Sequence, residues 1–360
     1  MSKAARITYA VSFVGALFGT LGAGVSQPGP GVAGVTDHVI AISRSATLRY
    51  WTVQRMRRAL TPPERVRREP AAAGPRSPAG SRSTAMAATR PETPPDAAGA
   101  DSRSTAMAMT RPETPPVAAG APAAGTADRH AGQSSPGTAW ASPGAVRATT
   151  GKVFFTINGA DFVCSAGTVN GANRDVVVTA GHCVQDAAGV WARNWIYVPG
   201  YDQGSRPYGA FTARHMFVPS AWSARHDENH DVAMVALATA GGRHVADVVG
   251  AQNLAFDQPR GSLVYGFGYP TGGHYDGERL AYCSGVPRPD THRLTQDQGL
   301  RCDMSEGASG GPWLARFNAT TGTGVVTSVN SFKYSDDPAT MYGPYFGAAV
   351  RRIYEQAQHA

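Results

Sequence analysis

Three residue types that together can perform acyl transfer occur along the chain in the order His182, Asp231 and Ser309. His182 follows an apolar run within Thr-Ala-Gly-His-Cys, Asp231 opens a second apolar run, and Ser309 lies within Gly-Ala-Ser-Gly-Gly-Pro. A serine hydroxyl is a weak nucleophile at neutral pH, so an imidazole must take its proton and a carboxylate must orient the imidazole. The sequence therefore predicts Ser309 as nucleophile, His182 as general base and Asp231 as the orienting carboxylate.

The glycines around Ser309 would let a bound carbonyl group approach the backbone closely. We expect the N–H groups of Gly307 and Ser309 to form an oxyanion hole, which is a pair of donors for the charge that develops on the carbonyl oxygen. Asp227 and Glu228 lie close to Asp231 and are alternative candidates for the orienting carboxylate. In that case Asp231 could be a structural residue that caps a loop at the edge of a strand.

Two other kinds of site share part of this pattern. Gly307-x-Ser309-x-Gly311 matches the nucleophile elbow of the α/β-hydrolases, but in that fold the acid and the histidine follow the serine, and only His359 follows Ser309. Residues 226–230 read His-Asp-Glu-Asn-His, which lacks the His-Glu-x-x-His order of a zinc site. We therefore expect no metal, and the acyl-transfer chemistry itself requires no cofactor.

Composition divides the 360 residues into two unequal parts. Residues 151–360 contain all four cysteines and most of the aromatic residues, and they suffice for a substantial core. From Thr52 to Ala139 there is no Phe, Tyr, Trp or Cys, so we predict that this stretch is disordered. Residues 81–87 recur at 102–108, and this Pro-rich duplication indicates a linker, because it cannot stack into a core.

The net charge of +7 does not indicate nucleic-acid binding, because the excess lies in the leader. Residues 1–150 have 17 Lys and Arg against 8 Asp and Glu, whereas residues 151–360 have 16 against 18. The basic leader could touch a membrane or another anionic cell surface weakly, although a solvated spacer is the favoured interpretation.

The N-terminus has the pattern of a secretory signal. Residues 1–6 are basic, and residues 7–25 carry no charge and are rich in Ala, Gly, Val and Phe. Cleavage near residues 24–26 is the preferred interpretation, and retention as a membrane anchor is the alternative. An even number of cysteines also fits an oxidising compartment, so a secreted, extracellular protein is expected.

Short apolar runs broken by Gly, Asn, Asp and Pro predict an all-β sandwich or barrels from about residue 151 onwards. Helical spacing of apolar residues predicts one closing helix over residues 350–357, and residues 46–60 could form an amphipathic helix. The expected strands are Lys152–Ile157, Val176–Thr179, Trp195–Val198, Val232–Leu237, Leu263–Phe267 and Gly324–Val329.

These motifs resemble the trypsin-like serine peptidases, and in detail the secreted bacterial branch related to the V8-type glutamyl endopeptidases. The similarity covers about residues 148–355 and is most specific over 179–183, 231–237, 265–270 and 302–312. It implies two six-stranded antiparallel β-barrels that meet near residue 255, with the triad in the cleft between them. It also implies the disulfides Cys164–Cys183 and Cys283–Cys302.

The resulting domain prediction has four parts. They are a signal peptide or anchor at 1–26, a pro-region and repeat linker at 27–147, a first barrel at 148–255, and a second barrel with the C-terminal helix at 256–360. Tyr50-Trp51-Thr52 to Met56-Arg57 is similar to a segment of the pro-regions of actinobacterial enzymes of this kind, which supports a removable leader.

One departure from the family concerns activation. Ala308 stands where trypsins have the aspartate that receives the new N-terminal ammonium group, so this salt bridge cannot form here. Removal of the leader would then act by uncovering the cleft or by releasing the domain.

Substrate recognition is less clearly defined by the sequence. Asp303 lies six residues before Ser309, where trypsins keep the aspartate that selects Arg or Lys, but it could also be structural. Glutamyl preference is a weaker alternative, because the strand around Ser328, Val329 and Asn330 offers no histidine. These three residues are expected to pair with an extended substrate backbone, as strands of the family do.

The expected function is that of a secreted, monomeric serine endopeptidase that acts on proteins or peptides. Two alternatives remain open. The first is a catalytically weak or inactive homologue that binds peptides or cell-wall material, and the second is an esterase that uses the same triad.

Overall fold

The computed structural model describes residues 33–59, 66–67 and 134–360 of the chain. The signal-like stretch 7–25 and most of the Pro-rich linker therefore lie outside the described residues. The described residues from 34 onwards belong to one compact unit. Within the described ranges, no helix is both long enough and apolar enough to cross a membrane.

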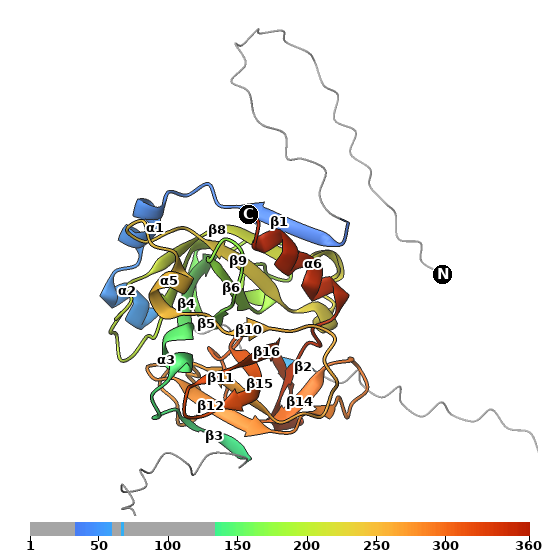
Figure 1. Ribbon diagram of the computed structural model, residues 1–360. Coiled ribbons are helices and arrows are strands. Elements are labelled where there is room, and N and C mark those ends of the chain that lie inside the picture. The colour runs from blue at the N-terminus through green and yellow to red at the C-terminus, as the bar shows by residue number, and fades with distance from the viewer. Residues whose placement is uncertain (1–32, 60–65, 68–133) are drawn as a thin grey trace, which may run out of the picture. The chain divides into compact units, whose positions relative to one another are not determined.

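The first half of this unit is a closed barrel of six antiparallel strands (Figure 1). The strands follow one another around the ring in the order β4, β5, β6, β9, β8 and β7, and β7 pairs back to β4. Their bounds are β4 (Thr150–Ile157), β5 (Ala160–Thr168), β6 (Val176–Thr179), β7 (Arg193–Pro199), β8 (Phe211–Pro219) and β9 (Ala233–Leu237).

Strand β4 shows why the predicted strands are continuously apolar instead of alternating. Successive side chains of a strand point to opposite faces. Val153 and Phe155 belong to one buried cluster, whereas Phe154 between them belongs to another. Because both faces of the strand are covered, both sets of positions must be apolar.

The second half consists of two sheets. In the first, the order is β10 (Asn253–Leu254), β16 (Thr323–Val329), β15 (Pro312–Asn318), β11 (Val264–Gly268), β12 (Ala281–Gly285) and β3 (Ser135–Ala139). In the second, it is β13 (Arg288–Pro289), β14 (Gln298–Arg301), β18 (Asp337–Gly343), β17 (Phe332–Tyr334) and β2 (Val66–Arg67). With the first barrel, these sheets give the two-barrel, all-β architecture that the sequence predicted.

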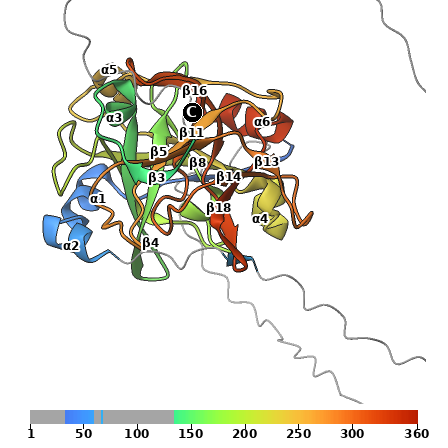
Figure 2. The same ribbon diagram turned by 90° about the horizontal axis from the view of Figure 1, so that it is seen from below.

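Six α-helices accompany the strands in the described part of the chain. They are α1 (Arg44–Tyr50), α2 (Val53–Arg58), α3 (Ala145–Thr149), α4 (Ser220–Arg225), α5 (Val245–Val249) and α6 (Ala348–Ala357). Figure 1 places α1 and α2 on one flank of the first barrel and α6 on the other, and Figure 2 shows α4 on the same side as α6. The predicted C-terminal helix is confirmed, and its buried residues are Val350, Ile353 and Ala357.

All six predicted strands are confirmed, with ends that shift by at most two residues. The amphipathic segment near residue 50 is helical, but it is divided into α1 and α2 by Trp51 and Thr52. The prediction of disorder was wrong at both ends of its range, because α2 and β3 are ordered there. The prediction rested on the average composition of residues 52–139, and this range stops just short of Trp51 and Trp140. Both tryptophans are buried, and they anchor the short elements beside them.

Residues before 148 contribute to the packed sheets. Strand β3 pairs with β12, and Trp140 is only 5% exposed. Its ring packs edge-on against Phe267 and Tyr282 at centroid distances of 5.4 and 5.0 Å. The first of these two sheets is therefore completed by a segment that precedes the whole first barrel in the chain.

A buried lysine connects the two halves. Lys152 of β4 donates from Nζ to the carbonyl oxygen of Gly277 at 2.8 Å and lies 3.7 Å from the carboxylate of Glu278. Glu278 also accepts from the hydroxyl of Tyr201 at 2.9 Å. Burial lowers the pKa of Lys152, and the negative charge of Glu278 opposes this effect.

Candidate active site

His182 lies in a short turn, Gly181–Cys183, that follows β6. Cys183 forms a disulfide with Cys164 of β5, so the turn is fixed to the neighbouring strand. A Cβ atom at Gly181 would lie 3.0 Å from the ring of Trp222, which explains a small residue beside the histidine. The His182 side chain is only 9% exposed, so its orientation is set by the protein.

Asp231 is fully buried at the start of the apolar run that forms β9. Its Oδ2 lies 2.8 Å from Nδ1 of His182, and its Oδ1 accepts from the backbone N–H of His182 at 2.8 Å. The hydroxyl of Ser331 donates to Oδ2 at 2.5 Å. A carboxylate at this position accepts a hydrogen bond from Nδ1–H, so Nε2 of His182 is left with a lone pair that can accept a proton.

Ser309 lies in a loop that is pressed between both halves of the molecule. Gly307 and Gly310 have φ angles of 83° and 78°, which other residues rarely adopt. A Cβ atom at Gly310 would lie 2.1 Å from Oγ1 of Thr179, and one at Gly311 would lie 1.9 Å from the carbonyl oxygen of Phe267. The glycines are therefore required by close backbone contacts as well as by conformation.

Ser165 of β5 anchors this loop from the first barrel. Its backbone N–H donates to the carbonyl oxygen of Ser309 at 2.8 Å, and its Oγ donates to that of Gly307 at 2.8 Å. The same Oγ accepts from the N–H of Tyr269 at 2.9 Å. Ser165 is completely buried, so these bonds are shielded from water.

Asn330 anchors the same loop from the second half. Its Nδ2 donates to the carbonyl oxygens of Ala308 and Phe267 at 2.9 and 2.8 Å, and its Oδ1 accepts from Nε1 of Trp313 at 2.7 Å. Its backbone carbonyl accepts from the N–H of Gly310 at 2.8 Å. Neutral hydrogen bonds thus hold the residues on both sides of Ser309. Ala308 itself has no carboxylate with which a salt bridge could hold this loop.

The donors predicted for the oxyanion hole remain available. Within the described part of the chain, the N–H groups of Gly307 and Ser309 make no hydrogen bond. Among the same residues, no hydrogen bond joins Oγ of Ser309 to the His182 ring. The backbone of Ser309 is nevertheless close to the turn that carries His182, because its carbonyl oxygen lies 3.8 Å from Sγ of Cys183. Such contacts are often long without substrate and tighten in the complex.

Asp303 is exposed at the surface. Its Oδ1 accepts from the hydroxyl of Tyr275 at 2.6 Å, and its backbone N–H donates to the carbonyl oxygen of Pro136 at 2.7 Å. The residue that follows in that segment, Gly137, leaves no room for a side chain, because a Cβ atom would lie 1.7 Å from Oδ1 of Asp303. The carboxylate therefore already has a partner and contact with solvent.

The strand predicted to receive the substrate backbone is partly occupied. Ser328 and Val329 pair with β15, and both are buried. The backbone N–H of Asn330 donates to Gly311 and its carbonyl accepts from Gly310, so neither group is free for a substrate. The chain then continues through Ser331, beside Asp231, into β17.

Sequence reasoning did not identify Ser165, Ser331 or the structural role of Asn330. Ser165 and Ser331 are single polar residues that no motif distinguishes, although their positions beside Cys164 and Asn330 were a weak signal. Lys333 was also missed: it is buried, and its Nζ donates to the carbonyl oxygens of Cys302 and Pro338 at 2.9 and 2.7 Å.

Asp297 is a buried carboxyl group near Asp231 of the predicted triad. It is 1% exposed, and neither of its carboxyl oxygens has a hydrogen-bond partner among the described residues. Burial raises its pKa well above the usual value, and the negative charges of Asp231, Glu228 and Asp290 act in the same direction. It lines a cavity of about 150 Å³ at the start of α6.

The predicted disulfides Cys164–Cys183 and Cys283–Cys302 are both present. Atoms of Cys164, His182 and Cys183 lie within 4.8 Å of one another, a spacing that would suit a metal. The two sulfur atoms are bonded to each other, however, so they offer no thiolate ligand.

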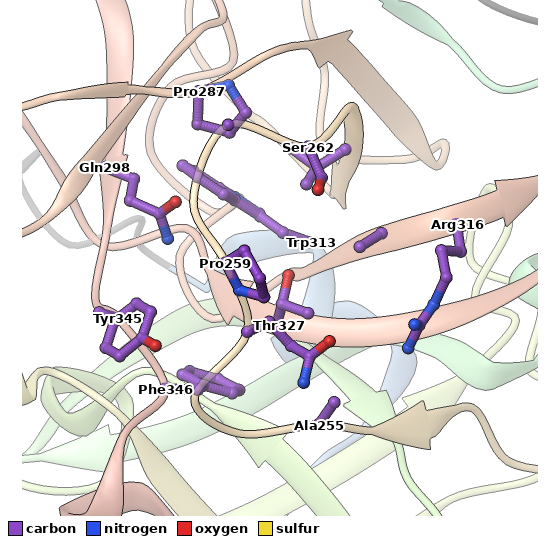
Figure 3. Close-up of a pocket in the computed structure, with 14 residues that line it drawn as sticks. Ala255, Pro259, Ser262, Pro287, Gln298, Trp313, Arg316, Thr327, Tyr345 and Phe346 are labelled. Carbon is purple, nitrogen blue, oxygen red and sulfur yellow. The ribbon is translucent and has the colours of Figure 1, made fainter.

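A cavity of about 340 Å³ is lined by residues of the second half. Figure 3 shows Gln298, Tyr345 and Phe346 on one side of it and Arg316 on the other. Trp313 lies between them, and its Nε1 reaches Asn330 behind the nucleophile loop. None of the residues predicted for catalysis lines this cavity.

Comparison with known proteins agrees with this geometry. Residues 162–322 match the trypsin-like peptidase domain. The thermostable serine protease AL20 from an extremophilic microorganism is 40% identical with a TM-score of 0.56, over 60% of this chain and 99% of that chain. This chain is a trypsin-like serine peptidase.

Other relatives extend the comparison. The protease Anisep from Arthrobacter nicotinovorans is 38% identical with a TM-score of 0.57, over 59% of the peptidase and 96% of Anisep. A Glu endopeptidase shares the fold at 19% identity and a TM-score of 0.50, over 64% and 99% of the two chains. The "Extracellular metalloprotease" of Bacillus subtilis (strain 168) is 34% identical over 65 residues, which are 18% of the peptidase and 21% of that relative. The peptidase thus spans only about a fifth of this last relative.

Ser165→Ala is expected to lower kcat by about 10- to 100-fold with little change in KM, because small displacements of a reacting group have effects of this size. The substitution removes the bond to Gly307 and leaves the Tyr269 N–H without its acceptor. Steady-state kinetics on a peptide ester and on casein would measure the effect. Ser262→Ala, at an exposed position, is the control, and equal kinetics of the two variants would contradict the anchoring role.

Asp297→Asn is expected to stabilise the peptidase at pH 8 but not near pH 4. Because the folded-state pKa is raised, the folded chain keeps a proton that the unfolded chain has released, so the cost to stability grows as the pH rises above about 3.9. The gain in free energy of unfolding should reach about 1.4 kcal/mol for each unit by which the folded-state pKa exceeds the unfolded one.

Urea unfolding at both pH values would measure this difference. Asp276→Asn, at an exposed position, controls for the loss of one acidic group. A pH-independent effect of Asp297→Asn would show that the carboxyl group is ionised in the folded state.

Proposed function

We propose that the peptidase hydrolyses peptide bonds through an acyl-enzyme on Ser309. The observation that supports this best is the buried Asp231, which holds both the backbone N–H and the Nδ1 of His182. A histidine fixed in this way presents Nε2 to a neighbouring hydroxyl group, which is the arrangement that activates a serine.

In the first half of the reaction, Oγ of Ser309 attacks the carbonyl carbon of the scissile bond while its proton passes to Nε2 of His182. The negative charge moves to the carbonyl oxygen, where the N–H groups of Gly307 and Ser309 stabilise it. The tetrahedral intermediate collapses when His182 gives the proton to the leaving amine.

In the second half, water attacks the ester on Ser309 and His182 takes its proton. Collapse of the second intermediate returns this proton to Ser309 and releases the carboxylic acid. Asp231 stabilises the imidazolium formed in each half of the reaction. Every proton is thus transferred by groups of the chain and by water.

We also propose that Asp303 gives a weak preference for substrates with Arg or Lys before the scissile bond. Its carboxylate is exposed and already accepts from Tyr275, so its attraction for a substrate cation is screened by solvent. The backbone of Ser328 and Val329 is proposed to pair with an extended substrate, whereas both backbone groups of Asn330 already bond within the chain.

Secretion is proposed from the signal-like N-terminus and the two disulfides, which persist in oxidising compartments. A monomer that contacts the cell surface only weakly through its basic leader fits the same picture. The remaining domain limits, 1–26 and 27–147 for the leader and 148–255 and 256–360 for the barrels, are part of this proposal.

Ser309→Ala and His182→Ala should each abolish labelling by a fluorophosphonate and lower kcat on casein by about a millionfold, since triad residues act as a unit. His230→Ala is the matched control, because His230 lies next to Asp231 in the chain but bonds to Asp227 instead. Labelling of His182→Ala at the normal rate would overturn the triad. Labelling of the unmodified enzyme without casein cleavage would favour an esterase, and absence of both would favour a binding protein.

Asp303→Asn should reduce kcat/KM for peptides with Arg or Lys before the scissile bond by less than about tenfold, as expected for an exposed charge. Peptides with Leu or Glu there should be unaffected. A peptide library compared between this variant, the unmodified enzyme and Asp276→Asn would measure the preference. A loss of 100-fold or more would indicate an enclosed pocket, and no change would make Asp303 structural.

A further inference from the structure

We propose that residues 34–59, here called the docking segment, remain bound to the first barrel after the chain is cut between residues 68 and 133. The active enzyme would then consist of two pieces that are held together without a covalent bond. The partner of this barrel surface is thus a segment of the same chain, and the proposal is independent of the catalytic mechanism.

Strand addition forms the first contact of the docking segment. Strand β7 pairs with β8 only at Phe211 and Thr212, and β1 (Val35–Val39) pairs antiparallel with β8 from His215 to Pro219. The pairing continues beyond both ends of β1, where Ser220 donates to the carbonyl of Gly34 and Ile40 donates to that of Arg214, each at 3.0 Å. Main-chain bonds of this kind provide affinity for an added strand.

Side chains reinforce this strand pair. The carboxylate of Asp37 lies 2.7 Å from Nε2 of His215 of β8. The ring of His38 stacks on Trp191 with their centroids 5.1 Å apart. The strand therefore contacts two separate parts of the barrel.

Trp51 is the aromatic anchor of the docking segment. It is 2% exposed although it lies between two short helices, and its ring packs 5.5 Å from that of Phe154 of β4. Its Nε1 donates to the carbonyl oxygen of Asn194 at the start of β7. A buried aromatic residue with its polar atom satisfied is typical of the residues that dominate stable interfaces.

Asp161 of the barrel provides an acidic contact for the docking segment. Its Oδ1 accepts from the hydroxyl of Tyr50 and its Oδ2 from Nε of Arg55, both at 2.6 Å. The guanidinium of Arg55 also lies over the Tyr50 ring, 3.8 Å from its centroid. Asp161 is only 15% exposed, and without the docking segment its remaining side-chain partner among the described residues is Thr156.

The position of these contacts does not conflict with catalysis. The barrel residues that bond to the docking segment, including Asp161, Asn194 and His215, are distinct from the triad and from the donors of the oxyanion hole. The added strand, the aromatic anchor and the charge pair together form the interface that we propose holds without a covalent link. Retention therefore leaves the catalytic groups unobstructed by residues 34–59.

The test uses the full chain with Ser309→Ala, which prevents self-cleavage, and with a site for a specific protease introduced at residues 118–124. After complete cutting, size-exclusion chromatography and native mass spectrometry at about 1 µM should show both pieces in one complex, as expected for a submicromolar interface. Separation of the pieces under these conditions would overturn the proposal. Since the readout does not depend on catalysis, such a failure would leave the proposed triad untouched.

Matched variants test whether the assigned contacts are responsible. Arg55→Ala should raise the dissociation constant of the cut complex by about fivefold, the upper end of what a partly exposed charge pair contributes. Arg58→Ala, which removes the same charge from an exposed position of α2, should leave it unchanged. Asp161→Asn removes the negative charge on the barrel side of this pair while nearly keeping the shape of the side chain. It should weaken binding to a similar extent as Arg55→Ala. Equal dissociation constants for Arg55→Ala, Asp161→Asn and Arg58→Ala would overturn the assigned interface.

Discussion

The buried charge of Asp231 is the constraint around which the site is organised. An ionised carboxylate without contact to water is costly unless several donors surround it. The donors come from both halves of the molecule, since His182 follows β6 of the first barrel and Ser331 precedes β17 of the second. Correct docking of the two halves and correct orientation of the histidine are therefore achieved by the same set of bonds.

The loop that carries Ser309 is likewise held by residues from both halves of the molecule. Ser165 fixes the carbonyl groups of Gly307 and Ser309 from one side, and Asn330 fixes Ala308 and Gly310 from the other. All of these groups are neutral. Where trypsins form a salt bridge upon cleavage, this loop is held by hydrogen bonds that do not depend on a new N-terminus, so its shape is independent of the ionisation of an amino group.

The sequence predicted those features that depend on local pattern. Continuous apolar runs predicted strands such as β4 and β6, because strands buried on both faces cannot alternate, and glycines marked the tight loop at Ser309. The residues that it missed act over long distances. Ser165 lies 142 residues before the carbonyl that its hydroxyl contacts, and Ser331 lies 100 residues after Asp231. A single serine has no periodicity, so only the fold identifies its partner.

Strand β1 pairs with residues far along the chain: Thr36 contacts Ser220, which is 184 positions later. Closing so long a loop is entropically costly and slow, and during synthesis the segment emerges long before the strand on which it docks. It is therefore poorly suited to nucleate the barrel, and its contacts should form after the rate-limiting step of folding. Interactions that are absent from the transition state chiefly slow unfolding. The docking segment would then lengthen the lifetime of the folded enzyme by slowing its unfolding. It would have much less effect on the rate at which the enzyme first folds.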